Sequence, residues 1–268
     1  MEIKQILQKY KIIPDPLKDQ FFLNDDQIIK KIVGFANLNK NDVVLEVGAG
    51  LGNLTEVIAK NAGRVIAFEV DKKFKPFLNK LPHNVDVRIE DAWEYIQLHG
   101  KWKKRKEYNK VVSNLPYSFV EKFLHNLTFL EYDKVILLVP IKFVNKIEIN
   151  PVFGSFFKVK TLLEVHKEKF IPVPRTNSMV IELIKLPDPI ENKNLALFLR
   201  QYIYQHEDQL AKNSLREGLI KYAKLIDNKK MTKNEAKNII FESKINKELL
   251  DKDINGSEIY YQVTQNFK

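Results

Sequence analysis

Short apolar runs alternate with helical patterns through the first half of the chain, and this alternation is the feature that most limits its fold. Five runs are nearly continuously apolar, as expected of strands covered on both faces; they span residues 42–47, 64–70, 85–89, 110–113 and 134–139. Between the first two runs, Leu54, Val57 and Ile58 have helical spacing. This alternation predicts a doubly wound α/β fold with a mostly parallel sheet.

Two later apolar runs, residues 157–165 and 178–186, are expected to form an antiparallel pair that closes one edge of the sheet. The prolines between them fall in the connection, where they cost no hydrogen bond of the sheet. After a linker-like stretch the pattern becomes helical, with a break and a helix cap expected at Asn255–Gly256–Ser257. We therefore expect a sheet domain of residues 1–187 and a small helical domain of residues 188–268.

The composition limits the partners of the chain and its chemistry. Its 268 residues carry a formal net charge of +10, which favours a polyanionic partner, nucleic acid before an acidic membrane, unless it only reflects a lysine-rich proteome. There is no cysteine, and the five histidines lack metal-site spacing, so no bound metal is expected. Without an apolar run of membrane-spanning length or a signal-peptide pattern, a cytoplasmic protein is expected.

A glycine-rich loop, in "VLEVGAGLGNLT", follows the first strand and opens a helix, with glycines at 48, 50 and 52. Two ligand classes compete for such a loop. Dinucleotide enzymes seat a pyrophosphate on G-x-G-x-x-G, but here the third glycine comes one residue early, and Glu46 would repel a pyrophosphate. That carboxylate suits a cationic ligand such as S-adenosylmethionine, which carries a sulfonium and an ammonium group.

Acidic residues follow the next two strands. Glu69 ends the second strand and can accept hydrogen bonds from both ribose hydroxyls, with Asp71 as the less favoured alternative. Asp91 follows the third strand and can accept from an adenine amine, while Ala92 offers its N–H to the ring. Each acid alone could be a helix cap. At successive strand ends after a glycine turn, they predict a nucleoside pocket.

The stretch "SNLPYSF" follows the fourth strand and should face the same crevice. The Asn114 side-chain oxygen and the Leu115 carbonyl, held outward by the rigid Pro116, can accept hydrogen bonds from an exocyclic amine of adenine. Tyr117 can stack on the base. This arrangement predicts catalysis by positioning and electrostatics without a covalent intermediate; the alternative is an ordinary Asn-x-Pro turn with a packed tyrosine.

Four motifs resemble those of the small-subunit ribosomal RNA adenine N6,N6-dimethyltransferase family, a branch of the class I S-adenosylmethionine-dependent methyltransferases. They are "DQFFLND" at residues 19–25, the glycine loop, "VVSNLPYSF" at residues 111–119 and "FIPVPRTNSMVIEL" at residues 170–183, with Asn177 at or beside a usually valine-like position. The likeness covers roughly residues 17–186, and more faintly the tail.

The resemblance implies a Rossmann-like methyltransferase sheet and S-adenosylmethionine as cofactor. It places Phe21 and Leu23 near the methionine end of the cofactor, Gly48 and Gly50 along it, Glu69 at the ribose, and Asp91 and Ala92 at the adenine. It also implies a catalytic loop of Asn114, Leu115, Pro116 and Tyr117, in which Asn114 contacts both the cofactor and the target amine. The family transfers two methyl groups to each of two adjacent adenosines near the 3′ end of small-subunit ribosomal RNA. A monomer acting on the pre-ribosomal small subunit is expected.

Two departures from the family pattern leave alternatives open. Phe21 stands where a polar residue is usual, and the segment after Val139 is shorter, with Phe157 where a serine falls. They motivate a second hypothesis: a weakly catalytic or non-catalytic RNA- or DNA-binding factor for assembly or transcription. A third hypothesis keeps methylation but moves it to DNA or to large-subunit RNA.

Basic and aromatic residues suggest where RNA could bind. The densest cluster, "KWKKRKEY" at residues 101–108, could contact phosphates and stack a base, or could be a solvated loop. In the tail, Arg200, Lys212 and Arg216 are candidate RNA contacts within helices that mainly pack.

Overall fold

The computed structural model describes residues 3–99, 107–130, 132–150, 152–206, 209–226, 228–252 and 257–267. They fall into two compact units. The first comprises Met1–Lys146 and Val159–Ile184, and the second comprises Ile147–Lys158 and Lys185–Lys268. Residues 147–158 thus group with the C-terminal helices, and the division into domains of residues 1–187 and 188–268 stays a prediction.

A seven-stranded sheet forms the centre of the first unit, in the order β4-β3-β2-β5-β6-β9-β7. The strands of this sheet are β2 (Val43–Val47), β3 (Arg64–Phe68), β4 (Val85–Arg88), β5 (Lys110–Asn114), β6 (Lys134–Pro140), β7 (Phe157–Val165) and β9 (Ser178–Lys185). Strands β2 to β6 pair in parallel, and β9 runs antiparallel to β6. The predicted doubly wound fold is confirmed, and β7 and β9 lie at one edge, as expected.

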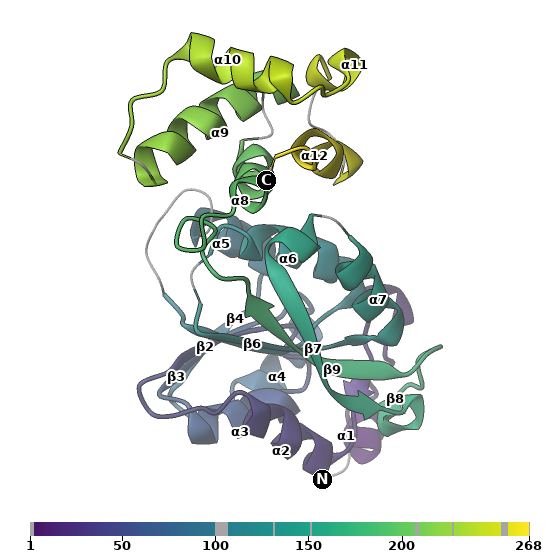
Figure 1. The fold of residues 1–268 in the computed structure, drawn as a ribbon. Coiled ribbons are helices and arrows are strands. Elements are labelled where there is room, and N and C mark those ends of the chain that lie inside the picture. Colours follow the sequence, from purple (N-terminus) through teal and green to yellow (C-terminus); the bar gives the residue numbers. More distant parts are fainter. Residues whose placement is uncertain are drawn as a thin grey trace. The chain divides into compact units, whose positions relative to one another are not determined.

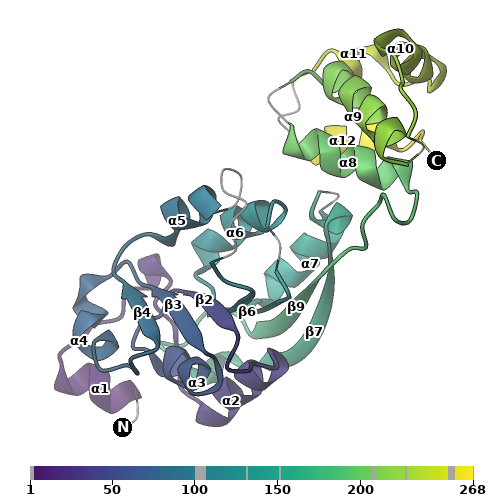
Figure 2. The ribbon, with the colours of Figure 1, turned by 90° about the vertical axis from the view of Figure 1, so that its left-hand side faces the viewer.

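Helices cover both faces of this sheet (Figures 1 and 2). Helices α2 and α3 lie on one face, and α5, α6 and α7 lie on the other. The helices of this part of the chain are α1 (Ile3–Lys9), α2 (Asp26–Phe35), α3 (Asn53–Asn61), α4 (Lys75–Leu78), α5 (Ala92–His99), α6 (Val120–Leu127) and α7 (Ile141–Ile149). The alternation read from the sequence therefore builds a three-layer arrangement with the sheet in the middle.

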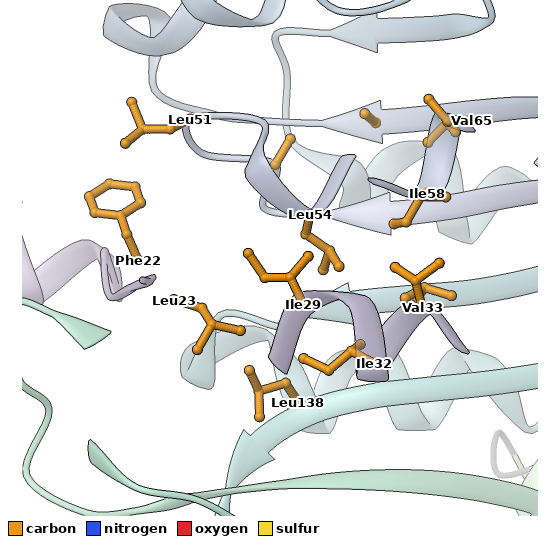
Figure 3. Packing of buried hydrophobic residues seen from close by; sticks show 14 of the residues in the cluster. Phe22, Leu23, Ile29, Ile32, Val33, Leu51, Leu54, Ile58, Val65 and Leu138 are labelled. Atoms are coloured by element: carbon orange, nitrogen blue, oxygen red, sulfur yellow. The ribbon is translucent and has the colours of Figure 1, made fainter. Parts of the chain in front are cut away.

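Helical spacing explains how the core forms between the sheet and one helical layer. Ile29, Ile32 and Val33 on α2 follow one face of the helix and are at most 4 % exposed. They pack with Ile58 of α3 and Leu138 of β6 (Figure 3). Apolar burial of this kind is the main favourable contribution to folding.

The segment before α2 pairs with a segment far along the chain. The two residues of β1 (Phe22–Leu23) pair antiparallel with β8 (Phe170–Ile171), Phe22 opposite Ile171 and Leu23 opposite Phe170. A short 3-10 helix, η1 (Pro16–Lys18), precedes this pair and is capped by the side chain of Asp15. The pairing fixes Phe22 and Leu23, the last two residues of what is here called the amino-terminal segment, residues 19–23.

The second unit is helical. Its helices are α8 (Leu195–Gln205), α9 (Ala211–Ile226), α10 (Lys233–Glu242), α11 (Lys247–Leu250) and α12 (Ser257–Thr264). The tail residues predicted as RNA contacts each have a partner inside this unit. Arg200 donates to the Thr264 hydroxyl and lies over the ring of Tyr261, Lys212 pairs with Asp251, and Arg216 pairs with Glu217.

Some predictions from sequence concern residues outside the described ranges. These are residues 101–106 of the basic cluster and Asn255–Gly256 of the expected break before α12. Among the residues that the structure does describe, no helix is long and apolar enough to cross a membrane.

Candidate active site

A cavity of about 360 Å³ opens at the carboxyl ends of the parallel strands. Ligands of open α/β sheets bind at this edge, because the loops that leave the strands converge there. Nine of the eleven residues predicted as catalytic or cofactor-binding line this cavity: Phe21, Leu23, Gly48, Gly50, Glu69, Asp91, Ala92, Asn114 and Pro116. Leu115 and Tyr117 are not among its lining residues.

The glycine loop is held in a backbone conformation that other residues rarely adopt. Gly48 and Gly50 have φ of 81° and 55°, in the left-handed region that favours glycine. A Cβ at position 48 would lie 3.1 Å from the ring of Pro116, and one at position 50 would lie 3.1 Å from the ring of Phe22. The loop thus needs glycine both for its turn and for its close approach to the catalytic loop and the amino-terminal segment.

Glu46 places a buried carboxyl group in the cavity wall. The residue is 1 % exposed, and its Oε2 atom has no hydrogen-bond partner among the described residues. Burial raises the pKa of Glu46 to about 8; the nearby Thr55 hydroxyl opposes this rise, and the negative charge of Glu69 adds to it. A buried polar atom without a partner is unfavourable, and a positively charged ligand group would supply the missing partner.

Glu69 is held by the backbone at the tip of β3. Its Oε2 accepts from the Gly50 N–H at 2.7 Å, and its Oε1 accepts from the Asp71 N–H at 2.9 Å. Burial raises the pKa of Glu69 even though these hydrogen bonds oppose the rise. Since each carboxylate oxygen can accept more than one hydrogen bond, the fixed carboxylate can still receive ribose hydroxyls.

Asp71, the alternative to Glu69, has a different role. It does not line the cavity, and its Oδ2 accepts from Gln20 at 2.9 Å and lies 3.2 Å from the Lys73 ammonium. Burial would raise the pKa of Asp71, but the hydrogen bonds from Gln20 and Lys73 outweigh it and hold the pKa below its ordinary value. Of the two acids, Glu69 therefore lines the cavity and Asp71 does not.

Asp91 and Ala92 lie where α5 begins. The Asp91 Oδ1 accepts from the Trp93 N–H at 2.9 Å, so this side chain caps the helix and also lines the cavity. Val70, which the sequence argument passed over, lines the cavity with 60 % of its surface exposed. In a cavity that Glu69 and Asp91 also line, this exposed apolar side chain is suited to pack against a flat heterocycle whose edge faces the acids.

Asn114 ends β5 and is oriented by the amino-terminal segment. Its Nδ2 donates to the carbonyl oxygen of Phe21 at 3.2 Å. Because a carbonyl can only accept, the nitrogen of the amide must face Phe21, and the amide oxygen lies on the other side. The amide oxygen is then the group that Asn114 can offer to a donor in the cavity.

The rest of the catalytic loop packs tightly. Leu115 is 1 % exposed, and its N–H donates to Leu138 of β6 at 3.2 Å. Pro116 has φ of −54° and leads into the 3-10 turn η3 (Tyr117–Phe119). The ring of Tyr117 stacks on that of Phe21, with centroids 5.7 Å apart, and burial raises the pKa of the Tyr117 hydroxyl.

Two contacts of the amino-terminal segment were missed by the sequence argument. The Asp19 Oδ2 accepts from the Ser118 N–H at 2.9 Å, and the Gln20 amide joins Asp71 to the Lys73 ammonium. Neither contact has a sequence signature, because each joins residues more than fifty positions apart. Asp19 and Gln20 both line the cavity, so the amino-terminal segment forms one of its walls.

The residues present fit S-adenosylmethionine. Glu46 offers a buried carboxylate to a cationic group, and Glu69, Asp91 and Val70 offer hydrogen-bond acceptors and an apolar wall to a nucleoside. Together with the strand order, this cavity defines a Rossmann-like methyltransferase.

Sequence comparison narrows this class. The family described as ribosomal RNA adenine dimethylase matches residues 18–248. The chain is 31% identical over 233 residues to the ribosomal RNA small subunit methyltransferase A of Thermotoga maritima, covering 82% of this chain and 80% of the relative. It is 32% identical to the probable ribosomal RNA small subunit methyltransferase A of Methanosarcina barkeri, covering 74% and 70%. The chain belongs to the ribosomal RNA adenine dimethylase family.

Solved structures share the fold. A dimethyladenosine transferase from Plasmodium falciparum superposes with a TM-score of 0.58 at 18% identity, covering 92% of this chain and 97% of that one. The 23S rRNA methyltransferase ErmE gives a TM-score of 0.54 at 17% identity, covering 91% and 98%. With the family membership, the protein is an S-adenosylmethionine-dependent rRNA adenine methyltransferase, as the motifs indicated.

Proposed function

We propose that this protein adds two methyl groups to N6 of each of two adjacent adenosines near the 3′ end of small-subunit ribosomal RNA. The relatives named for the small subunit support this choice of RNA. The number and place of the adenosines follow from the family resemblance. The formal net charge of +10 suits binding to an RNA backbone.

The chain contributes positioning and electrostatics to the reaction. S-adenosylmethionine supplies the methyl group as an activated sulfonium. The Asn114 amide oxygen and the Leu115 carbonyl accept hydrogen bonds from the target amine and turn its nitrogen lone pair out of conjugation with the ring. No residue needs to act as a general base, since the methylated amine can lose its proton to solvent. Preorganised acceptors of this kind need no rearrangement during the reaction.

The observation that carries this proposal is the hydrogen bond from Asn114 Nδ2 to the Phe21 carbonyl. It fixes which atom of the amide can accept from the substrate. It also gives a role to the backbone of Phe21, whose side chain departs from the family pattern. Tyr117, predicted to stack on the target base, stacks on Phe21 in this structure.

Substitution of Asn114 tests the proposal. We expect Asn114→Ala to lower methyl transfer from labelled S-adenosylmethionine to unmethylated small ribosomal subunits by about a thousandfold, the loss typical of a preorganised polar group. The melting temperature should stay unchanged, because the side chain is only partly buried and makes one long hydrogen bond. Scintillation counting of the RNA measures the transfer.

Asn114→Asp is the matched variant. It keeps an oxygen acceptor but cannot donate to the Phe21 carbonyl, so we expect activity between those of the wild type and Asn114→Ala. Full activity in Asn114→Ala would contradict the proposed role of this amide.

The remaining expectations belong to the same proposal. We propose the pre-ribosomal small subunit as the partner, a monomer as the active form and the cytoplasm as the place of action. The relatives and solved structures named above are methyltransferases, so the non-catalytic alternative has no support among them.

A further inference from the structure

Residues 19–21 contact the catalytic loop and Ser118, which directly follows it, at three points. The Asp19 carboxylate accepts from the Ser118 N–H, the Phe21 carbonyl accepts from Asn114, and the Phe21 ring stacks on Tyr117. Two of these contacts involve the backbone or ring of Phe21. Of the three contacts, the one from Asp19 is made by a polar side chain. Substitution of Asp19 can therefore remove this contact without altering the two made by Phe21.

Asp19 has a backbone conformation suited to this contact. Its φ and ψ are 55° and 30°, in the left-handed region, where aspartate is better tolerated than most residues. Its N–H donates to the Pro16 carbonyl at 3.2 Å, and its own carbonyl accepts from Phe21 at 2.9 Å. The backbone on both sides is therefore fixed, and the side chain is directed to the loop.

The neighbouring Gln20 anchors this segment from the other side. It is 8 % exposed, its Nε2 donates to Asp71 at 2.9 Å, and its Oε1 accepts from Lys73 at 2.8 Å and from the Asp15 N–H at 2.9 Å. Two of these three contacts, to Asp71 and Lys73, hold Gln20 on the segment that follows β3. A segment held in this way can position the catalytic loop that it contacts.

Before Pro116 the catalytic loop is held by β6, since the Leu115 N–H donates to the Leu138 carbonyl, so the turn after Pro116 is the part that depends on other contacts. Pro116 has no N–H to donate, and within the turn the Phe119 N–H donates to the Pro116 carbonyl at 2.9 Å. The Ser118 N–H is oriented by the Asp19 carboxylate at 2.9 Å, a charge-assisted hydrogen bond. This hydrogen bond ties the turn that follows Pro116 to a fixed part of the protein.

We propose that Asp19 is a positioning residue for the catalytic loop. Its hydrogen bond to Ser118 fixes the turn after Pro116 and thereby places the Asn114 oxygen and the Leu115 carbonyl for the target amine. The expected effect of Asp19 on activity rests on the proposed function. Its expected effect on the conformation of the loop does not depend on that function.

Three variants test this inference. Asp19→Gly removes the carboxylate while glycine readily keeps a positive φ, and Asp19→Asn keeps an oxygen acceptor and tolerates the same conformation. Asn37→Gly is the matched control, because Asn37 also has a positive φ, of 47°, and is exposed far along the chain from the loop. Each full-length variant is compared with the wild type.

The first measurement does not depend on methyl transfer. Hydrogen exchange of peptides that cover residues 114–119 should be about tenfold faster in Asp19→Gly than in the wild type, and near the wild-type rate in Asp19→Asn and Asn37→Gly. Unchanged exchange in Asp19→Gly overturns the inference, whether or not the wild type methylates RNA.

The second measurement separates positioning from a structural role. In Asp19→Gly, kcat for methyl transfer should fall about tenfold or more, since a misplacement of about 1 Å can cost roughly a hundredfold. The melting temperature should stay within error, the fold loss of kcat should exceed the fold rise of the Kd for S-adenosylmethionine, and Asp19→Asn should recover most of the kcat. A kcat loss that matches a loss of cofactor affinity or of melting temperature, or that Asp19→Asn does not recover, overturns the inference. An inactive wild type with the predicted exchange pattern would count against the proposed function alone.

Discussion

Glu46 and Glu69 place two buried carboxyl groups in one cavity, at 1 % and 7 % exposed. Their environments differ. Both oxygens of Glu69 accept backbone hydrogen bonds, whereas Glu46 has an oxygen without a partner among the described residues. Without a ligand, Glu46 with its pKa of about 8 is largely protonated at neutral pH. A cation in the cavity favours the ionised form, so binding of such a ligand is linked to loss of a proton.

This linkage predicts the pH dependence of cofactor binding. The pKa of Glu46 is raised in the ligand-free protein and should fall when a cationic group binds, so binding releases a proton below about pH 8. The affinity for S-adenosylmethionine should therefore rise as the pH is raised from 6 to 8. Titration calorimetry at pH 7 in two buffers with different ionisation enthalpies measures the proton release.

Glu46→Gln is the control for this prediction, since it has a similar shape and no proton to release. It should bind S-adenosylmethionine more weakly and without proton release in the same buffers. Proton release that persists in Glu46→Gln, or proton uptake by the wild type, would show that Glu46 does not face the cationic part of the ligand.

At the scale of elements, the amino ends of the strands carry a different polar network. Lys110, the first residue of β5, donates to Asp42 at 2.9 Å and to the Asn37 carbonyl at 2.8 Å. Asp42 also accepts from Asn109 at 2.8 Å and from Asn39. Burial would raise the pKa of Asp42, but the hydrogen bonds from Asn109 and Lys110 outweigh it and lower the pKa. The network joins β2 to β5, the strands that carry the glycine loop and Asn114.

Breaking this buried pair should destabilise the fold. Lys110→Met leaves the buried Asp42 without its cation, which typically costs about 3 kcal/mol or more in the free energy of unfolding. Urea denaturation measures the change. Because the pKa of Asp42 is lowered in the folded protein, its carboxylate stabilises the fold at pH values above the ordinary aspartate pKa of about 3.9. This contribution to the free energy of unfolding is lost as the pH falls below that value. The difference between the wild type and Lys110→Met should therefore shrink below about pH 4.

An exposed pair provides the control. Lys60 and Glu56 form an ion pair on α3 with side chains 62% and 53% exposed. Lys60→Met should change the free energy of unfolding by no more than about 0.5 kcal/mol, because exposed pairs of this spacing contribute little. An equal effect of both substitutions would contradict the role given to the buried pair.

The elements of the sheet could be predicted because their local pattern and their packing agree. The run at 134–139 became β6 (Lys134–Pro140), and the run at 157–165 became β7 with the same bounds. The pairing of β1 with β8 could not be predicted, since each strand has two residues and they lie far apart in the chain. Such short strands are fixed by tertiary packing and not by propensity.

At the scale of the whole molecule, the site could be predicted where strand ends bring residues together. Glu69, Asp91 and Asn114 line one cavity because the carboxyl ends of β3, β4 and β5 meet at one edge of the sheet. Asp19 and Gln20 could not be assigned roles, because contacts between distant side chains and backbone have no period or motif. A positive φ at Asp19 is allowed by its residue type but is not required by it.

The central claim is that this chain carries out N6,N6-dimethylation of adenosines in small-subunit ribosomal RNA, and mapping of the modified nucleotides tests it most directly. Small ribosomal subunits from cells that lack this protein are incubated with it and S-adenosylmethionine, and the RNA is digested and analysed by mass spectrometry. We expect two adjacent dimethylated adenosines near the 3′ end, absent when Asn114→Ala replaces the wild type. No methylated adenosine in this RNA, or methylation only in large-subunit RNA or DNA offered in parallel, would contradict it.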